Sequence, residues 1–193
     1  MIYTKKIGMA IKFAAKTHNQ YQNQTRKGKV IPYISHPLTA GIILALAGAS
    51  EDVVVAGILH DTIEDSVPEK KVTAEMLSER FGDRVAGLVL SVTETDKTLS
   101  WDDRKRQALE HVAHFSNDSL LVKSADILSN VSETVNDYRN HGDEVFAHFS
   151  VPKEKMIGHQ LSVIAAILER WKENPLTEDL LSIEGELRAI RAE

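Results

Sequence analysis

The 193-residue sequence contains no cysteine. Disulfide bonds, cysteine-ligated zinc sites and thiol nucleophiles are therefore excluded together, and any bound metal would have to be held by histidine and carboxylate side chains. No apolar run approaches the roughly 20 residues that cross a bilayer, and the N-terminus has neither the apolar stretch nor the cleavage site of a signal peptide. These absences predict a soluble, cytoplasmic protein with no membrane partner.

The sequence also has fewer basic than acidic residues. Lys and Arg number 23 against 28 Asp and Glu, which gives a formal net charge of −5, and no Lys/Arg tract is present. Because binding to a nucleic acid duplex depends on neutralising phosphates, we expect no nucleic acid partner. A local basic cluster remains compatible with a small anionic ligand. The sequence leaves the oligomeric state open.

The hydrophobic pattern has the period of helices throughout. Apolar residues recur three and four positions apart in most segments, and no segment shows sustained strand alternation. We therefore predict an all-α, compact helical bundle that forms a single domain over residues 1–193, with a core at about 4–135 and C-terminal helices at about 136–193. Helices are expected at about 4–18, 37–46, from 50 onward, 73–81, 83–92, 101–115, 119–131, 153–171 and 177–190.

Residues 58–65 read Ile-Leu-His-Asp-Thr-Ile-Glu-Asp, and four of these side chains handle metals or protons. The apolar lead-in at 53–59 predicts a buried helix, on which the four side chains form a polar stripe. An ionised carboxylate in an apolar interior is costly, so the stripe must meet a cation, a hydrogen-bond network or a water-filled cleft. The alternative is a helix end that reaches solvent, with Glu64 and Asp65 exposed before Pro68.

Two other apolar segments carry candidate ligands. His36 precedes Pro37 at a predicted helix start, where the helix dipole favours the neutral, metal-ligating form of imidazole. Asp126 and Asn130 lie one turn apart in the segment 119–131 and share a helix face. The resulting set of two imidazoles and two carboxylates consists of His36, His60, Asp61 and Asp126. Such a mixed set suits Mn²⁺, Fe²⁺, Zn²⁺ or Mg²⁺.

The N-terminal part of the chain offers one more histidine and a basic segment. We expect His18 to cap the first helix or to lie on the surface, because a histidine in the last turn interacts favourably with the helix dipole. The polar segment 19–30 contains Arg26-Lys27-Gly28-Lys29 and is expected to be a loop with concentrated positive charge. A solvated loop without a ligand is the alternative.

The order His36…His60-Asp61…Asp126 resembles that of the HD superfamily of metal-dependent phosphohydrolases. The resemblance is closest to the Rel/Spo-type alarmone hydrolase domains and the Mesh1 branch of small stand-alone relatives, and it spans most of residues 1 to about 135. The similar segments are Arg26-Lys27, 32–37, 59–65, Phe81-Gly82, Val92-Thr93, 96–99, 104–106 and 122–126.

This resemblance implies an all-helical hydrolase that uses Mn²⁺ and metal-activated water to remove the 3′-pyrophosphate from guanosine tetra- or pentaphosphate. It implies that the metal ligands are His36, His60, Asp61 and Asp126. It implies that Glu64 and Asp65 handle the attacking water. The implied nucleotide-binding residues are Arg26, Lys27, Tyr33 and Asn130. Lys97 and Arg104 are further candidates, because they are positively charged and lie in segments similar to the family, and we expect them to bind the leaving pyrophosphate.

The sequence departs from the family pattern beside the predicted metal aspartate. Ile127 and Ser129 stand where the family has a cation and a ring. The choice between guanosine alarmones and another nucleotide, such as an adenosine alarmone, NADPH with its 2′-phosphate or a nucleoside phosphate, therefore stays open.

Overall fold

A computed structural model of the chain describes residues 3–94 and 98–193. Every regular element in these two ranges is helical, and the sole extended pairing within them is an isolated antiparallel bridge between Thr25 and Pro32. The prediction of an all-α fold is therefore confirmed. None of the described helices combines the length and apolarity needed to span a bilayer.

The helices follow one another with short connections. The α-helices are α1 (Lys5–Ala15), α2 (Ser35–Leu46), α3 (Glu51–Leu59), α4 (Thr62–Asp65), α5 (Ala74–Phe81), α6 (Asp83–Val92), α7 (Trp101–Val112), α8 (Asn117–His141), α9 (Lys153–Arg170) and α10 (Thr177–Ala192). Three short elements of other pitch are the π-helix η1 (Lys16–Tyr21) and the 3-10 helices η2 (Pro68–Lys70) and η3 (Gly142–His148).

Side-chain caps explain several of the predicted boundaries. The hydroxyl of Thr4 accepts a hydrogen bond from the backbone N–H of Ile7 at the start of α1, and Thr73 does the same for Met76 at the start of α5. Such caps satisfy N–H groups that have no partner inside the helix. The predicted start of α5 at Thr73 and the predicted range of α6 are both confirmed.

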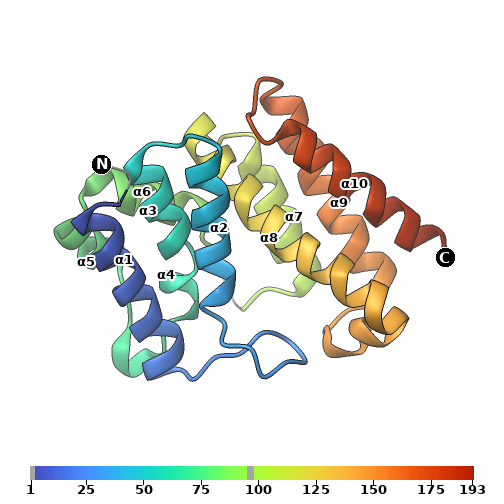
Figure 1. Cartoon of the computed structure of the whole chain (residues 1–193), viewed down its shortest axis with the longest axis horizontal. Helices are drawn as coiled ribbons and strands as arrows, with labels where there is room; N and C mark the ends of the chain where they lie inside the picture. Colours follow the sequence, from blue (N-terminus) through green and yellow to red (C-terminus); the bar gives the residue numbers. More distant parts are fainter. Residues whose placement is uncertain (1–2, 95–97) are drawn as a thin grey trace.

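The 25-residue helix α8 lies at the centre of the arrangement (Figure 1). Helices α2 and α3 pack on each other and on α8, while α1 and α6 pack on α3. On the other side of α8, α9 and α10 pack against each other and against α8 (Figure 1). The buried apolar side chains of all these helices form one continuous core.

The predicted buried helix does not run unbroken through residues 58–65. Helix α3 ends at Leu59, and α4 begins at Thr62. At this break, side chains donate the hydrogen bonds that the last carbonyl groups of α3 accept. His60 Nδ1–H donates to the carbonyl of Gly57 at 2.7 Å, and the Thr62 hydroxyl donates to the carbonyl of Leu59 at 2.7 Å.

The expectation for His18 was wrong. The first helix continues beyond the expected end as the π-helix η1, and the His18 side chain within it is fully buried. A π-helical turn shifts the side chains that follow it to another face, here toward the interior. Burial of His18 thus depends on a local change of helix pitch that apolar periodicity does not reveal.

Two glycines set the separation of α2 and α3. A Cβ at Gly41 would lie 2.6 Å from Ile58 Cγ1, and a Cβ at Gly57 would overlap Leu44 Cδ1. Glycine at both positions therefore leaves room for the Ile58 and Leu44 side chains between the two helices. His36 lies in one of these helices and His60 follows the other, so the contact also bears on the placement of the two imidazoles.

We expect Gly57→Ala to lower the free energy of unfolding by about 1–3 kcal/mol, because the added methyl group overpacks against the fully buried Leu44. The matched control is Gly87→Ala on the exposed face of α6, where an added Cβ meets no atom within 4 Å. The control is expected to be neutral or to stabilise by about 0.4–1 kcal/mol. Urea unfolding of both variants measures the difference, and equal stability of Gly57→Ala and the parent would contradict it.

Candidate metal centre

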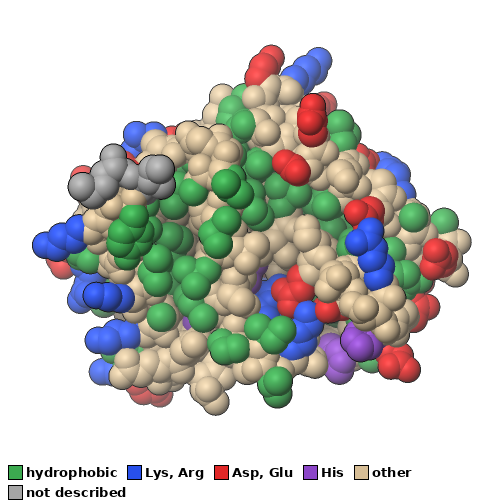
Figure 2. All heavy atoms as spheres, in the orientation of Figure 1, with side chains coloured by type: hydrophobic (Ala, Val, Ile, Leu, Met, Phe, Trp, Pro, Cys, Tyr) green, Lys and Arg blue, Asp and Glu red, His purple; other side chains and the backbone are tan. Residues whose placement is uncertain are grey.

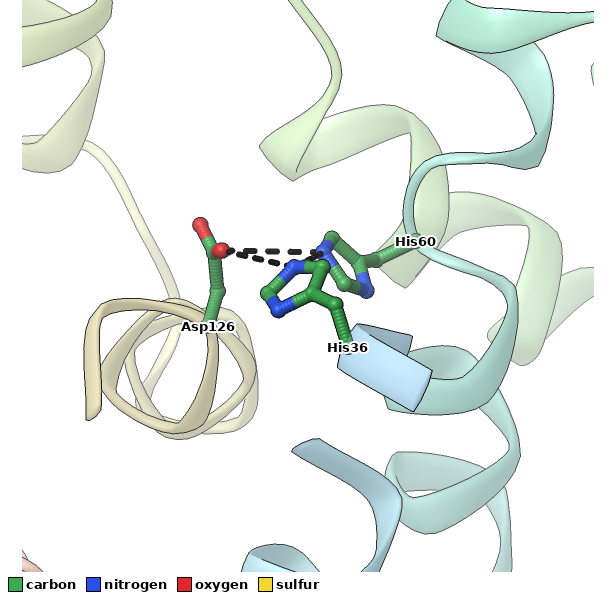
Figure 3. A group of neighbouring side chains, drawn as sticks. All are labelled: His36, His60 and Asp126. Carbon is green, nitrogen blue, oxygen red and sulfur yellow. Dashed lines mark hydrogen bonds and ion pairs between the residues drawn. The ribbon is translucent and has the colours of Figure 1, made fainter. Parts of the chain in front are cut away.

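Three helices bring His36, His60 and Asp126 to one point (Figure 3). His36 is the second residue of α2, His60 caps the end of α3, and Asp126 lies in the first half of α8. One ligand atom from each residue lies within 4.8 Å of the other two. Residues 90 positions apart in the sequence thus meet in the core, with His36 only 2% exposed and His60 only 4% exposed.

The distances between donor atoms suit a single divalent ion. His36 Nε2 lies 3.1 Å from His60 Nε2, and Asp126 Oδ1 lies 3.3 and 3.7 Å from these two nitrogens. Asp61 Oδ2 joins the group at 3.5 and 3.2 Å from the same nitrogens. Ligands about 2.1 Å from one ion lie about 3.0 Å apart at right angles and about 3.4 Å apart in a tetrahedron. The two imidazoles and two carboxylates therefore fit a divalent metal.

Hydrogen bonds fix the orientation of both imidazoles. His60 Nδ1–H donates to the carbonyl of Gly57. His36 Nδ1 lies 2.9 Å from the Ser129 hydroxyl, which donates its own proton to the carbonyl of His36 at 3.3 Å, so the ring nitrogen is the donor in this pair. Both Nδ1 atoms are therefore protonated, and both Nε2 atoms face the centre, where they would be the metal-binding atoms. Partners of this kind hold a histidine ligand in the correct tautomer.

The carboxylates of the centre are ionised. Burial by itself raises the pKa of Asp61, but His60 and His36 outweigh it and bring the pKa below its ordinary value. Burial likewise raises the pKa of Asp126, and Lys123 followed by the two histidines lowers it well below the ordinary value. The same carboxylates raise the pKa of His60 against the effect of its own burial. The negative aspartates and the positively charged form of His60 thus stabilise one another.

Three further side chains hold the two carboxylates in place. Lys123 Nζ lies 2.8 Å from Asp126 Oδ2, and Asn130 Nδ2 donates to Asp126 Oδ1 at 2.8 Å. Tyr33 donates its hydroxyl proton to Asp61 Oδ2 at 2.6 Å. Burial, followed by the nearby Asp61 and Asp65, raises the pKa of Tyr33 well above its ordinary value and keeps this donor protonated. The sequence reasoning missed Lys123, although its place one turn before Asp126 in an apolar segment was a usable signal.

A pocket of about 410 Å³ opens directly onto this centre. The predicted site residues that line it are Arg26, Lys27, Tyr33, His60, Asp61, Glu64, Asp65, Arg104, Asp126 and Asn130. His36 lies behind them in the core, and Lys97 lies outside the residues that the structure describes. Glu64 and Asp65 are partly buried in α4 on the pocket wall, so the alternative of an exposed helix end does not hold.

The basic segment between α1 and α2 is docked on α8. Arg26 donates to Glu133 Oε2 at 2.7 Å and to Asn130 Oδ1 at 2.8 Å, and Lys29 pairs with Glu133 and Asp137, each at 2.5 Å. Figure 2 shows basic and acidic side chains gathered where this segment passes α8. A purely solvated loop is therefore excluded for Arg26 and Lys29.

The far wall of the pocket comes from the C-terminal half of the chain. Lys27 Nζ lies 4.9 Å from the ring centroid of Phe149, and Trp101 and His159 pack edge to face with ring centroids 5.7 Å apart. Burial, then Lys105 and Lys123, lower the pKa of His159 to about 4 and keep its ring neutral. No motif or spacing in the sequence connects these residues with His60, so the sequence reasoning missed them.

Comparison with known proteins identifies relatives over most of the chain. Residues 10–154 match the HD domain family. A zebrafish (Danio rerio) protein named guanosine-3′,5′-bis(diphosphate) 3′-pyrophosphohydrolase MESH1 is 40% identical over 125 residues, which are 64% of this chain and 66% of the relative. The match thus spans just under two thirds of that relative's length.

Solved structures resemble this one over nearly their whole length. One, described as a metazoan ortholog of SpoT that hydrolyses ppGpp and plays a role in starvation responses, has a TM-score of 0.78 and 26% identity, covering 97% of this chain and 98% of the other. A second, from Listeria monocytogenes EGD-e, has a TM-score of 0.72 and 30% identity, covering 82% of this chain and 99% of the other.

We expect Ser129→Ala to weaken divalent-metal binding by about 10–100-fold, because the variant removes the acceptor that orients the His36 ring. The matched control is Ser162→Ala on the exposed face of α9, whose hydroxyl bonds only the carbonyl of Gly158. Isothermal titration with Mn²⁺ measures both affinities. Unchanged affinity in Ser129→Ala would contradict the orienting role.

Asp126→Ala is expected to lose the metal altogether, since it removes one candidate ligand and leaves Lys123 without its carboxylate. Elemental analysis after dialysis against metal-free buffer is the readout. Full metal content in this variant would place the ion elsewhere.

Proposed function

Because the chain belongs to the HD-domain family, we propose that it is a metal-dependent hydrolase that removes the 3′-pyrophosphate from guanosine tetra- or pentaphosphate. The observation that carries this proposal is the shared pocket: three of the four candidate metal ligands, the carboxylates of Glu64 and Asp65 and a cluster of cations line one cavity of about 410 Å³. A cavity of this size accommodates a nucleotide.

The proposed cofactor is one Mn²⁺ ion held by the Nε2 atoms of the two histidines and by the two aspartates. Imidazole and carboxylate together suit Mn²⁺ among the divalent ions. A divalent ion bound at such a site polarises a phosphoryl oxygen and lowers the pKa of bound water. The hydrogen bonds from Tyr33 to Asp61 and from Asn130 to Asp126 keep the ligand oxygens turned inward.

Glu64 and Asp65 are the proposed residues that manage the attacking water. They follow the proposed ligands His60 and Asp61 by four positions in the chain and lie on the pocket wall in α4. A carboxylate in this place accepts the proton of the nucleophile and orients it toward the phosphorus, which is general base assistance.

The cations of the pocket are the proposed sites for the phosphates of the substrate. Arg26 is linked through Asn130 to the ligand Asp126, so phosphate recognition and the metal centre share one hydrogen-bonded chain. Partial burial, then Lys105, Arg26 and Arg104, lower the pKa of Lys27, which reflects like charges at close range. A polyanionic substrate relieves this repulsion. Lys97 remains a predicted phosphate ligand from the sequence.

The nucleotide base that the pocket accepts depends on Ile127 and Ser129, the two positions beside Asp126 where the chain departs from the family pattern. Ser129 faces His36, so its replacement of the family's ring belongs to the metal centre. Ile127 lines the pocket, where its apolar side chain meets the substrate. An adenosine alarmone, NADPH or a nucleoside phosphate is accordingly the alternative substrate.

We expect guanosine tetraphosphate with Mn²⁺ to give the highest kcat/KM in a panel that also contains its adenosine analogue, NADPH and nucleoside triphosphates. Arg26→Ala and Lys27→Ala should each raise KM about 10–100-fold, because each removes charge-assisted bonds to phosphate. Lys172→Ala, an exposed residue after α9, is the control with unchanged KM. Higher turnover of another member of the panel would favour the alternative substrate.

Glu64→Gln and Asp65→Asn are expected to lower kcat by about 10²–10⁴-fold with smaller effects on KM, since a neutral amide cannot take the proton of water. Single-turnover assays at saturating Mn²⁺, with metal content checked by elemental analysis, measure this effect. Glu173→Gln on the surface is the control. A rate within about threefold of the parent in both variants would refute the assignment.

A further inference from the structure

Asp65 receives a hydrogen bond from a side chain that itself is held by a buried histidine. Gln24 Nε2 donates to Asp65 Oδ2 at 2.9 Å, and Gln24 Oε1 lies 2.8 Å from His18 Nδ1. The three residues come from η1, from the segment after it and from α4, and the last two are 41 positions apart. One amide therefore connects a fully buried ring to a carboxylate on the pocket wall.

The backbone around Gln24 is fixed on both sides. Its N–H donates to the carbonyl of His18 at 2.8 Å, and its carbonyl accepts from the N–H of Tyr33 at 2.9 Å. The next residue forms the bridge between Thr25 and Pro32. With both backbone groups bonded, the side chain of Gln24 starts from a defined place, and little conformational freedom is lost when it binds Asp65.

The direction of the two hydrogen bonds follows from the partners. Burial lowers the pKa of His18, so its ring is neutral and carries one N–H. If Nδ1–H is the donor, Gln24 Oε1 accepts and the amide NH₂ faces Asp65. With the amide reversed, its oxygen would face a carboxylate oxygen at 2.9 Å, a repulsive contact between two acceptors. The Asp65 carboxylate, which can only accept, thus selects the amide orientation in which it receives a proton donor, and this orientation requires Nδ1–H on His18.

The same imidazole also contacts a residue that bonds a candidate metal ligand. The rings of His18 and Tyr33 lie 5.0 Å apart, and Tyr33 donates to the ligand Asp61. His18 thereby contacts the two side chains that hold Asp61 and Asp65. A single buried ring on a π-helical turn is thus connected to both carboxylates through one intervening side chain each.

We propose that Gln24 and His18 are positioning residues that hold the Asp65 carboxylate in the orientation in which it acts on the attacking water. This inference rests on the proposed role of Asp65 in the hydrolysis. A misplacement of a catalytic group by about 1 Å costs on the order of 10²-fold in rate, so the loss of either bond is expected to be visible in kcat.

The first test replaces the bridging amide. Gln24→Ala should lower kcat by about 10–100-fold while KM and Mn²⁺ content stay within about twofold of the parent, because neither the phosphate cluster nor the metal ligands change. The matched control is Asn174→Ala, which removes a buried amide that bonds Ser124 and the N–H of Leu176 outside the pocket lining and should lower stability without changing kcat. A rate within threefold of the parent in Gln24→Ala would overturn the inference.

The second test separates orientation from packing at His18. In His18→Asn the side-chain NH₂ can replace Nδ1–H as donor to Gln24, whereas His18→Leu fills the space without a donor. We expect His18→Asn to retain at least about tenfold more kcat than His18→Leu, with folding of both checked by thermal unfolding. Equal rates in the two variants would show that the ring contributes packing only and would overturn the role of His18.

The third test connects the inference with Asp65 through a double-mutant cycle. If Gln24 acts through Asp65, adding Gln24→Ala to Asp65→Asn changes kcat by less than about threefold. An undiminished effect in that background would show that Gln24 acts elsewhere and would overturn the inference alone. A near-parental rate in Asp65→Asn itself would instead remove the proposed role of Asp65, so the two failures are distinguishable.

Discussion

The structure depends on a cluster of buried groups whose charges require a cation. Two imidazole nitrogens lie 3.1 Å apart, and two ionised carboxylates lie within 3.7 Å of them. Isolated carboxylates at such a depth would cost several kcal/mol each. Lys123, Asn130 and Tyr33 offset part of this cost, because each donates a hydrogen bond to one of the two carboxylates.

The metal centre and the pocket form one hydrogen-bonded system. Asn130 donates to Asp126 with its NH₂ and accepts from Arg26 with its oxygen, so the loop between α1 and α2 is tied to a candidate ligand in α8. Glu133, one turn further, holds the other side of Arg26. Since α8 also packs against α2, α9 and α10, the position of the basic loop depends on the whole bundle.

The helical fold and most of the candidate site were predictable because both rest on local patterns. Apolar periodicity predicted α6 at its observed bounds, and Thr73 signalled the start of α5. Polar residues inside apolar segments, at His60-Asp61 and at Asp126, indicated buried groups in need of partners, and the structure brings them together. The pattern failed at 58–65, where side-chain bonds to the carbonyls of α3 interrupt the helix.

By itself, the sequence determined which residues are candidate metal ligands and in which apolar segments they stand, because ligand chemistry and helix periodicity are properties of neighbouring residues. Only the tertiary structure decided the burial of His18, the partners of Gln24 and the far wall formed by Phe149 and His159. These features depend on contacts between residues tens of positions apart. Such contacts arise when helices pack to fill a common core, and no local spacing encodes them.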